Sequence, residues 1–127
     1  MRRTILITLT TLLISLALCT MSHIRVTRVV KHARHLRTEA IEAIDVDDAQ
    51  RAETVLVELA GFLDEEQGWL EVLCEHDDLH EIKAAIIDAQ ASIEFGITDD
   101  FYQAIYRFGE SLEHIADVES VRLTNFY

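Results

Sequence analysis

The sequence predicts an all-α protein in which an N-terminal transmembrane helix continues into a small antiparallel helical bundle. The 127 residues contain no proline and only four glycines, so the turn residues on which all-β folds depend are scarce. One uncharged apolar run near the N-terminus has the length of a membrane span. Apolar residues then recur every three or four positions through most of the chain, which is typical of amphipathic helices.

The distribution of charge divides the chain into two parts. Residues 1–38 carry seven basic residues and no acidic one, whereas residues 39–127 carry all 23 acidic residues and four basic ones. The basic part suits anionic lipid headgroups, and the acidic part repels nucleic acid, so we predict no nucleic-acid partner. We predict a transmembrane anchor (or uncleaved signal) at 1–24, a basic juxtamembrane helix joining the bundle at 25–45, and an acidic helical bundle with a short C-terminal tail at 46–127.

Thr4–Ser22 is the predicted membrane anchor. These 19 residues reach about 28 Å as a helix, close to the thickness of a bilayer core, and their threonine hydroxyls can bond back to helix carbonyls. Two alternatives are a secretory signal cleaved after Ala17-Leu18-Cys19 and a lipoprotein signal with Cys19 lipidated, and the bulky Leu18 strengthens neither. An uncleaved anchor is favoured because the helical pattern continues without a break. The continuation consists of Val26, Val29, Val30, Ala33, Leu36, Ala40 and Ile44.

The first helix predicted after the basic segment begins at a capping box formed by Asp47 and Gln50. Gly61 and Gly68 weaken this helix, and a bend or break is predicted near 64–68. Its apolar face comprises Ala49, Ala52, Val55, Leu56, Leu59, Phe62, Leu63, Trp69, Leu70 and Leu73.

Two more helices are predicted in the C-terminal part. Asp78 and Glu81 form a second capping box, Gly96 stands where a helix-ending glycine belongs, and Thr98 can cap the last helix. The tail at 117–127 is predicted to lie on the bundle in extended form. The two buried faces comprise Leu79, Ile82, Ile86, Ala89 and Ile93, and Phe101, Ile105, Phe108, Leu112 and Ile115.

The stretch 76–80 (HDDLH) has the strongest metal-ligand character. His76 and His80 are four positions apart, as metal-binding histidines on helices are, but the predicted helix start lies between them. We therefore predict no metal site and no cofactor, with His76, Glu81 and His114 as an alternative ligand set. No catalytic or cofactor-binding residue is predicted, because no nucleophile–base pair and no glycine-rich loop is found.

Four residues are candidates for contact with a partner: Trp69, His76, Glu81 and His114. Trp69, the only tryptophan, lies on an apolar stripe and is predicted to be in the core, with partner contact as the alternative. His114 is predicted near a helix C-terminus, where the helix dipole favours a cation.

Ordered stretches of the acidic part carry a family resemblance: Trp69-Leu70, residues 73–82, 91–94, 111–115 and 123–126. They resemble an uncharacterised bacterial family, domain of unknown function four-three-six-three, whose members begin with one hydrophobic helix and continue as a helical domain. The resemblance covers nearly the whole chain and implies an architecture but no known activity. The matching positions are Trp69, His76, Glu81, Glu113, His114 and Leu123 to Phe126.

This sequence departs from the family pattern at two places. His80 stands where members usually carry an acid, and the stretch from Arg25 to Arg37 is more basic than expected. The second departure bears on membrane orientation: the positive-inside rule places the bundle in the cytoplasm, whereas the resemblance favours the extracytoplasmic side.

The predicted function is that of a non-enzymatic, membrane-anchored accessory or interaction protein. Its predicted partners are the membrane, through Thr4–Ser22, and another membrane or envelope protein. The alternative is an envelope sensor that binds a metal or another ligand through His76, Glu81 and His114. A hydrolase is disfavoured, since no reactive constellation is found.

Overall fold

Helices make up almost all of the described chain. The computed structural model describes the backbone of residues 1–126 and the side chains of residues 1–72 and 74–121. This part contains no strand, which confirms the predicted fold class. Its helices are α1 (Arg2–Asp45), α2 (Ala49–Glu65), α3 (Gln67–Leu73), α4 (His76–Phe95) and α5 (Thr98–Phe126).

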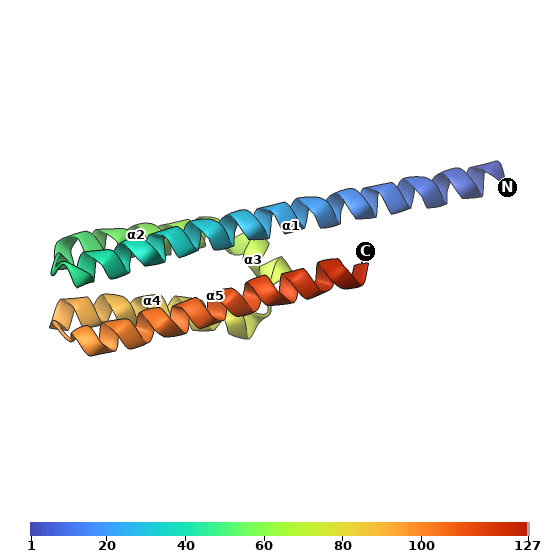
Figure 1. The fold of residues 1–127 in the computed structure, drawn as a ribbon. Coiled ribbons are helices and arrows are strands. Elements are labelled where there is room, and N and C mark those ends of the chain that lie inside the picture. Colours follow the sequence, from blue (N-terminus) through green and yellow to red (C-terminus); the bar gives the residue numbers. More distant parts are fainter. Residues whose placement is uncertain (127) are drawn as a thin grey trace.

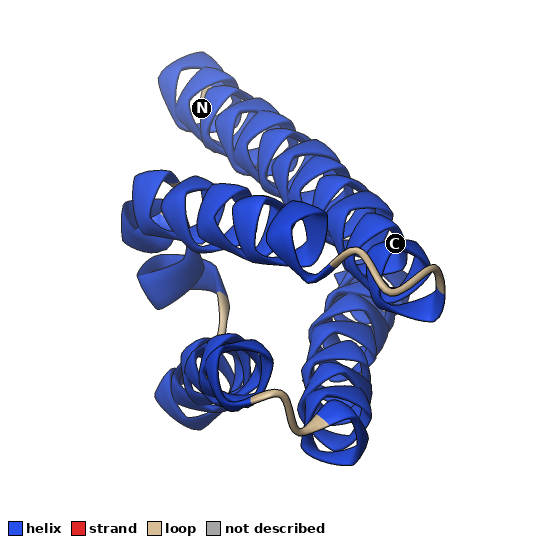
Figure 2. Ribbon diagram, turned by 90° about the vertical axis from the view of Figure 1, so that its left-hand side faces the viewer, coloured by secondary structure: helices blue, strands red, loops and turns tan. Residues whose placement is uncertain are grey.

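The four longer helices form an up-and-down bundle from which α1 projects (Figure 1). α1 packs on α2 and α5, α4 packs on α5 and α2, and successive long helices run in opposite directions. Figure 2 shows the resulting two hairpins, α1–α2 and α4–α5, side by side. The turns 46–48 and 96–97 lie at one end of the bundle, which we call the far end. The short helix α3 joins the hairpins at the other end, from which the N-terminal part of α1 emerges.

α1 is one uninterrupted helix of 44 residues, which confirms the predicted continuity between the apolar run and the bundle. Its buried side chains begin at Val26, and every described residue before that point is exposed or half-buried. The hydroxyls of Thr8, Thr10, Thr11 and Thr20 donate to carbonyls four residues earlier. These four hydroxyls are therefore satisfied within the helix, which is what an apolar environment requires of them.

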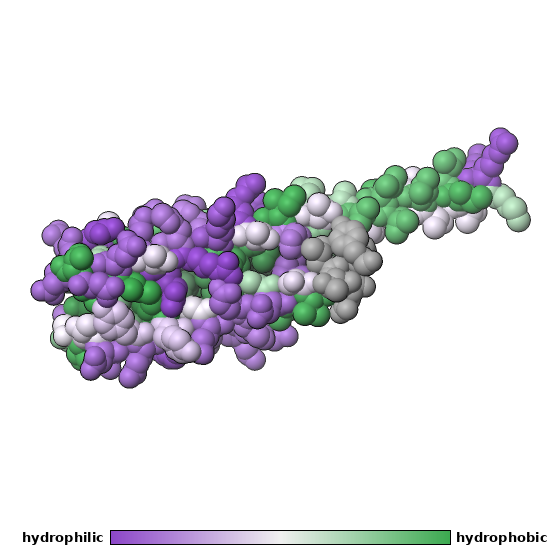
Figure 3. All heavy atoms as spheres, viewed as in Figure 1, coloured by the Kyte–Doolittle hydropathy of each residue, from purple (hydrophilic) through white to green (hydrophobic). Residues whose placement is uncertain are grey.

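The core lies between the four long helices and is almost wholly apolar. Its largest fully buried side chains include Phe101 and Phe108 of α5, packed among leucines and isoleucines of the other helices. Each such Leu, Ile or Phe contributes about 1.5–3 kcal/mol on burial, before the entropy cost of ordering the chain. On the face shown in Figure 3 the surface of the bundle is mainly hydrophilic, in contrast to the apolar projection of α1.

Both predicted capping boxes are wrong in detail. α2 is capped by Asp48, whose carboxylate accepts the Arg51 N–H at 3.1 Å. Asp47 adopts φ +60° in the turn, so the chain is still reversing direction there. α4 begins at His76, because the chain is extended only as far as Glu75. Asp78 is therefore in the first turn, where its negative charge interacts favourably with the positive end of the helix dipole, but it is not the capping residue.

The predicted break near 64–68 is confirmed, since α2 ends at Glu65 and α3 begins at Gln67. The predicted buried face continues past the break at Leu70 but not at Trp69. Leu70 is 3% exposed, whereas Trp69 is 43% exposed, so the prediction that Trp69 lies in the core is wrong.

α5 is longer than predicted. Gly96 adopts φ +70° and ends α4 as predicted, and α5 then runs from Thr98 to Phe126. The extended tail predicted for 117–127 is therefore wrong over the described backbone. No glycine or proline follows Gly109, so the sequence contains no strong signal to stop the helix. Val121, Leu123 and Phe126 were expected to lie back on the bundle. Val121 is 58% exposed, and the side chains of Leu123 and Phe126 are outside the described residues.

Candidate functional site

The most distinctive surface of the protein is the N-terminal part of α1. It is the one described stretch that is long and apolar enough to cross a membrane, by length and composition, and none of it is buried in the bundle. Its side chains are mostly apolar and carry no charge between Thr4 and Ser22, and hydroxyl side chains recur along one face at Thr4, Thr8, Thr11, Ser15 and Ser22. More than half of the surface is exposed for Ile5, Leu6, Ile7, Leu9, Leu12, Leu13, Ile14, Leu18 and Met21.

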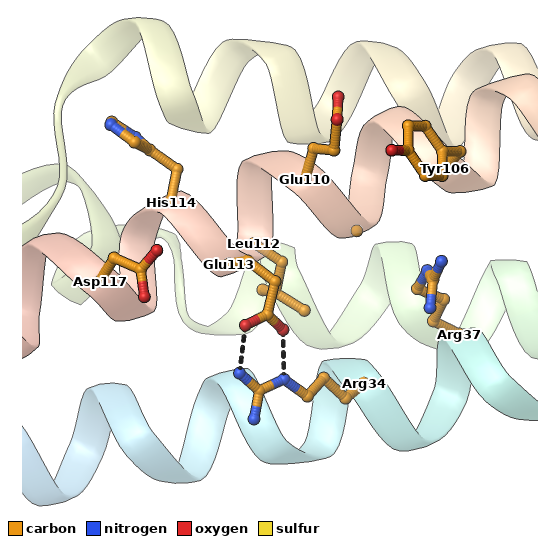
Figure 4. A pocket seen from close by; sticks show the side chains of 9 residues that line it. Arg34, Arg37, Tyr106, Glu110, Leu112, Glu113, His114 and Asp117 are labelled. Carbon is orange, nitrogen blue, oxygen red and sulfur yellow. Dashed lines mark hydrogen bonds and ion pairs between the residues drawn. The ribbon is translucent and has the colours of Figure 1, made fainter.

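Basic side chains that follow this stretch are used for packing within the protein. Arg34 forms a two-pronged ion pair with Glu113 of α5, with Nε–Oε1 and Nη2–Oε2 distances of 2.6 and 2.7 Å (Figure 4). Arg25 lies 2.9 Å from Glu66. These pairs join α1 to both of its neighbours. Among the described side chains of this region, Arg28 and Lys31 form no ion pair and are exposed, so both are available to a lipid headgroup.

The Arg34–Glu113 pair shifts the pKa values of both partners in the direction that favours their charged forms. The hydrogen bonds from Arg34 lower the pKa of Glu113 below its ordinary value, and those bonds raise the pKa of Arg34. Both side chains are about half exposed, so water screens the pair and its contribution to stability is about 1 kcal/mol or less.

A groove of about 440 Å³ lies between α1 and α5 around this pair (Figure 4). Its two arginines are already engaged, because Arg34 binds Glu113 and Arg37 donates to the carbonyl of Ile105. The groove contains both signs of charge and no set of free polar groups that converge on one point. We therefore do not assign it as a ligand site. Its lining comprises Arg34, Arg37, Tyr106, Gly109, Glu110, Leu112, Glu113, His114 and Asp117.

The alternative ligand residues are engaged separately along the α4–α5 interface. His114 Nδ1 lies 3.0 Å from Asp78 Oδ2, and Glu81 lies 3.7 Å from Arg107. Among the described residues, no group of three His, Cys, Asp or Glu is placed to hold a metal ion. The structure thus does not assemble a metal site from His76, Glu81 and His114, and ligand binding of another kind by these residues stays a prediction.

Two expectations about the histidines are wrong. His76 and His80 do share a regular helix, because α4 begins two residues earlier than predicted; both are exposed. His114 is not near a helix end, since α5 continues to Phe126. Its partner is the carboxylate of Asp78, rather than the negative end of a helix dipole.

Side-chain ion pairs and hydrogen bonds between different helices were not predicted from the sequence patterns. Arg107 bridges Glu81 and Asp88 across the α4–α5 interface. The hydroxyl of Tyr102 donates to Asp45, which ties the two turns at the far end together, and this bond raises the tyrosine pKa. These pairs depend on the register between antiparallel helices, for which spacing along one helix contains no signal.

Comparisons with protein-family models, with curated proteins and with solved structures found no match to this chain. The resemblance to the uncharacterised bacterial family therefore stays a prediction. The features of the chain that bear on its function are an exposed apolar helix, a compact bundle and ion pairs between the helices of that bundle.

Proposed function

We propose that the protein is a non-enzymatic, single-pass membrane protein that holds its acidic helical bundle against a membrane for contact with another membrane or envelope protein. The bacterial setting comes from the family resemblance. Sidedness is proposed from the same resemblance as extracytoplasmic, against the basic residues that follow the span.

One observation carries this proposal: the apolar part of α1 covers none of the bundle and is covered by none of it. A core helix buries one face, and this segment buries no residue before Val26. Each of its leucines and isoleucines would gain about 1.5–3 kcal/mol on leaving water, and a bilayer is the apolar environment that a helix of this length fits.

Unbroken continuity with the bundle favours an anchor that is retained. Removal of residues up to Cys19 would leave the buried face of α1 intact, because that face begins at Val26. The fold thus tolerates cleavage, and the mass of the mature chain decides between an anchor and a signal.

The anchor is tested by expressing the full chain with a tag after Tyr127 and extracting membranes with alkaline carbonate. We expect the chain in the membrane pellet with its full-length mass. Leu12→Arg and Leu13→Arg together should release it, because each central arginine costs about 2.5–3.5 kcal/mol on insertion. Val57→Arg, at an exposed apolar position of α2, is the matched control and should stay in the pellet. A soluble wild-type chain that lacks its first twenty or so residues would refute the proposal.

Partner contact is tested with photo-crosslinking amino acids at exposed positions of the bundle. Ile87 and Phe95 of α4 are both exposed and apolar. We expect a reproducible crosslink from at least one of them to an integral membrane or envelope protein, and its loss in the variant with both anchor arginines. Absence of any crosslink from a panel of positions around the bundle would contradict a role in protein contact.

Orientation is tested by labelling an introduced cysteine at the far end. Asp100→Cys, in a chain with Cys19→Ser and Cys74→Ser, places one thiol at an exposed position of α5. An impermeant maleimide should label it in intact cells if the bundle is extracytoplasmic. Labelling only after lysis would place the bundle in the cytoplasm and contradict the proposed side.

A further inference from the structure

α3 lies at the level where the apolar run ends. Arg25 follows Ser22, the last residue of that run, by three positions, or about 4.5 Å along the helix. The Arg25 guanidinium lies 4.8 Å from the centre of the Trp69 ring, and it also pairs with Glu66 just before α3. If the run spans the hydrocarbon core, Trp69 therefore falls within the headgroup region, which extends about 5–7 Å beyond the core on each side.

The exposed side of α3 has the composition of a membrane-interface segment. Trp69 is 43% exposed and Val72 is 79% exposed, while Leu70 is buried in the bundle. The polar side chains of α3 are satisfied by neighbours, because Gln67 contacts both Glu71 and Lys83 at 2.7 Å. Tryptophan is enriched at bilayer interfaces, where its ring body meets the acyl region and its N–H meets the headgroups.

The end of α5 reaches the same level. Val118 and Glu119 line a small cavity together with Val26 of α1, and α5 then continues toward the apolar part of α1 (Figure 1). Val121, the last described side chain of α5, is 58% exposed. Two separate elements thus present apolar side chains at the end of the bundle from which the anchor emerges.

We propose that this end of the bundle rests in the lipid interface, with Trp69 and Val72 inserted among the headgroups and upper acyl chains. The inference depends on the proposed anchor and specifies what its bundle contacts first. A lipid surface is favoured over a protein because the apolar side chains lie beside the root of the anchor, where lipid is the neighbour by default. The contact is apolar rather than electrostatic, since Asp64 and Glu65 are exposed nearby and Glu66 offsets Arg25. Neutral lipid should therefore suffice.

Trp69 makes the test direct, because it is the only tryptophan. The purified full chain is reconstituted into phosphatidylcholine vesicles that contain nitroxide-labelled lipid, with the label at the headgroup, at the upper acyl chain or near the bilayer centre. We expect strong quenching of Trp69 by the two shallow labels and weak quenching by the central one. Its emission should also be blue-shifted relative to a water-exposed indole.

Two rearranged single-tryptophan chains provide matched controls. Trp69→Phe with Val72→Trp keeps the probe on α3 and should be quenched like the wild type. Trp69→Phe with Phe95→Trp moves it to the far end, one α4 length of about 30 Å away, and should be quenched several-fold less. Far-ultraviolet circular dichroism establishes that both chains are folded.

The outcomes separate this inference from the proposed anchor. A chain that floats with the vesicles but whose Trp69 is quenched no more than the far-end probe overturns the interface contact and leaves the anchor standing. A chain that fails to float refutes the anchor, and the interface contact with it. Quenching at Trp69 and at the Val72→Trp probe, but not at the far end, supports both.

Discussion

Alanine substitutions at Gly61 and Gly109 test how closely α1 packs on α5. Both glycines are helical, and alanine is favoured over glycine inside a helix by about 0.5–1 kcal/mol. A Cβ added at Gly61 meets no atom within 4 Å, so the full benefit is expected there. A Cβ added at Gly109 would lie 2.8 Å from Nε and 2.9 Å from Cζ of Arg37, so the guanidinium has to move.

Moving Arg37 has a cost that can be bounded from its contacts. Its Nε donates to the Ile105 carbonyl at 3.2 Å, and a hydrogen bond of this kind contributes about 0.5–1.5 kcal/mol. The two effects at Gly109 oppose each other and are of similar size. We therefore expect Gly61→Ala to raise the free energy of unfolding by about 0.5–1 kcal/mol and Gly109→Ala to leave it nearly unchanged.

The assay is urea unfolding of the full chain in detergent micelles, followed by far-ultraviolet circular dichroism. In an Arg37→Ala background the obstruction is gone, so Gly109→Ala should recover the gain seen at Gly61. A gain of 1 kcal/mol corresponds to about 4–8 °C in Tm for a bundle of this size. If Gly109→Ala alone stabilises as much as Gly61→Ala does, Arg37 does not lie against α5 and the described packing is wrong.

Three further outcomes follow from the core and the ion pairs. Phe108→Ala removes a fully buried ring and should cost about 3–5 kcal/mol in the same assay; a cost below about 1 kcal/mol would mean that α5 does not face the core. Arg34 lowers the pKa of Glu113 below the ordinary 4.5. The stabilisation of the fold by this ion pair is therefore present above pH 4.5 and is lost as the pH falls through the lowered pKa of Glu113. Unfolding at a series of pH values should show this loss in the wild type and less of it in Arg34→Gln. The hydrogen bond to Asp45 raises the pKa of Tyr102 above 10.0. The stabilisation of the fold by this bond is therefore present below pH 10.0 and is lost as the Tyr102 hydroxyl ionises. Ultraviolet titration of wild type against Tyr102→Phe should show a late-ionising tyrosine that shifts earlier in Asp45→Asn.

Periodicity was sufficient to predict the long helices and most of the core. The predicted face Phe101, Ile105, Phe108, Leu112 and Ile115 is buried throughout, because α5 is amphipathic along that length and one stripe decides its orientation. The glycine at 96 likewise predicted the end of α4, since φ +70° is costly for other residues.

Local signals failed where two of them competed. Asp47 and Asp48 are both good caps, and the turn geometry, which places Asp47 at positive φ, decided for Asp48. Trp69 was misplaced because it lies at the margin of the apolar face: Phe62, seven positions earlier, is only half-buried, whereas Leu70 continues the buried stripe at 3% exposed. Contacts such as Arg34 with Glu113, 79 positions apart, depend on the packed register, which no local pattern specifies.

The unbroken course of α1 has a mechanical consequence. From Ser22 to Asp45 the helix rises about 35 Å without a glycine, a proline or a hinge. A rod of that length would convert a ten-degree tilt of the proposed membrane anchor into a sideways shift of about 6 Å at the far end. If the anchor spans a bilayer as proposed, a change in bilayer thickness that tilts it would move the far end of the bundle without changing the bundle's own shape.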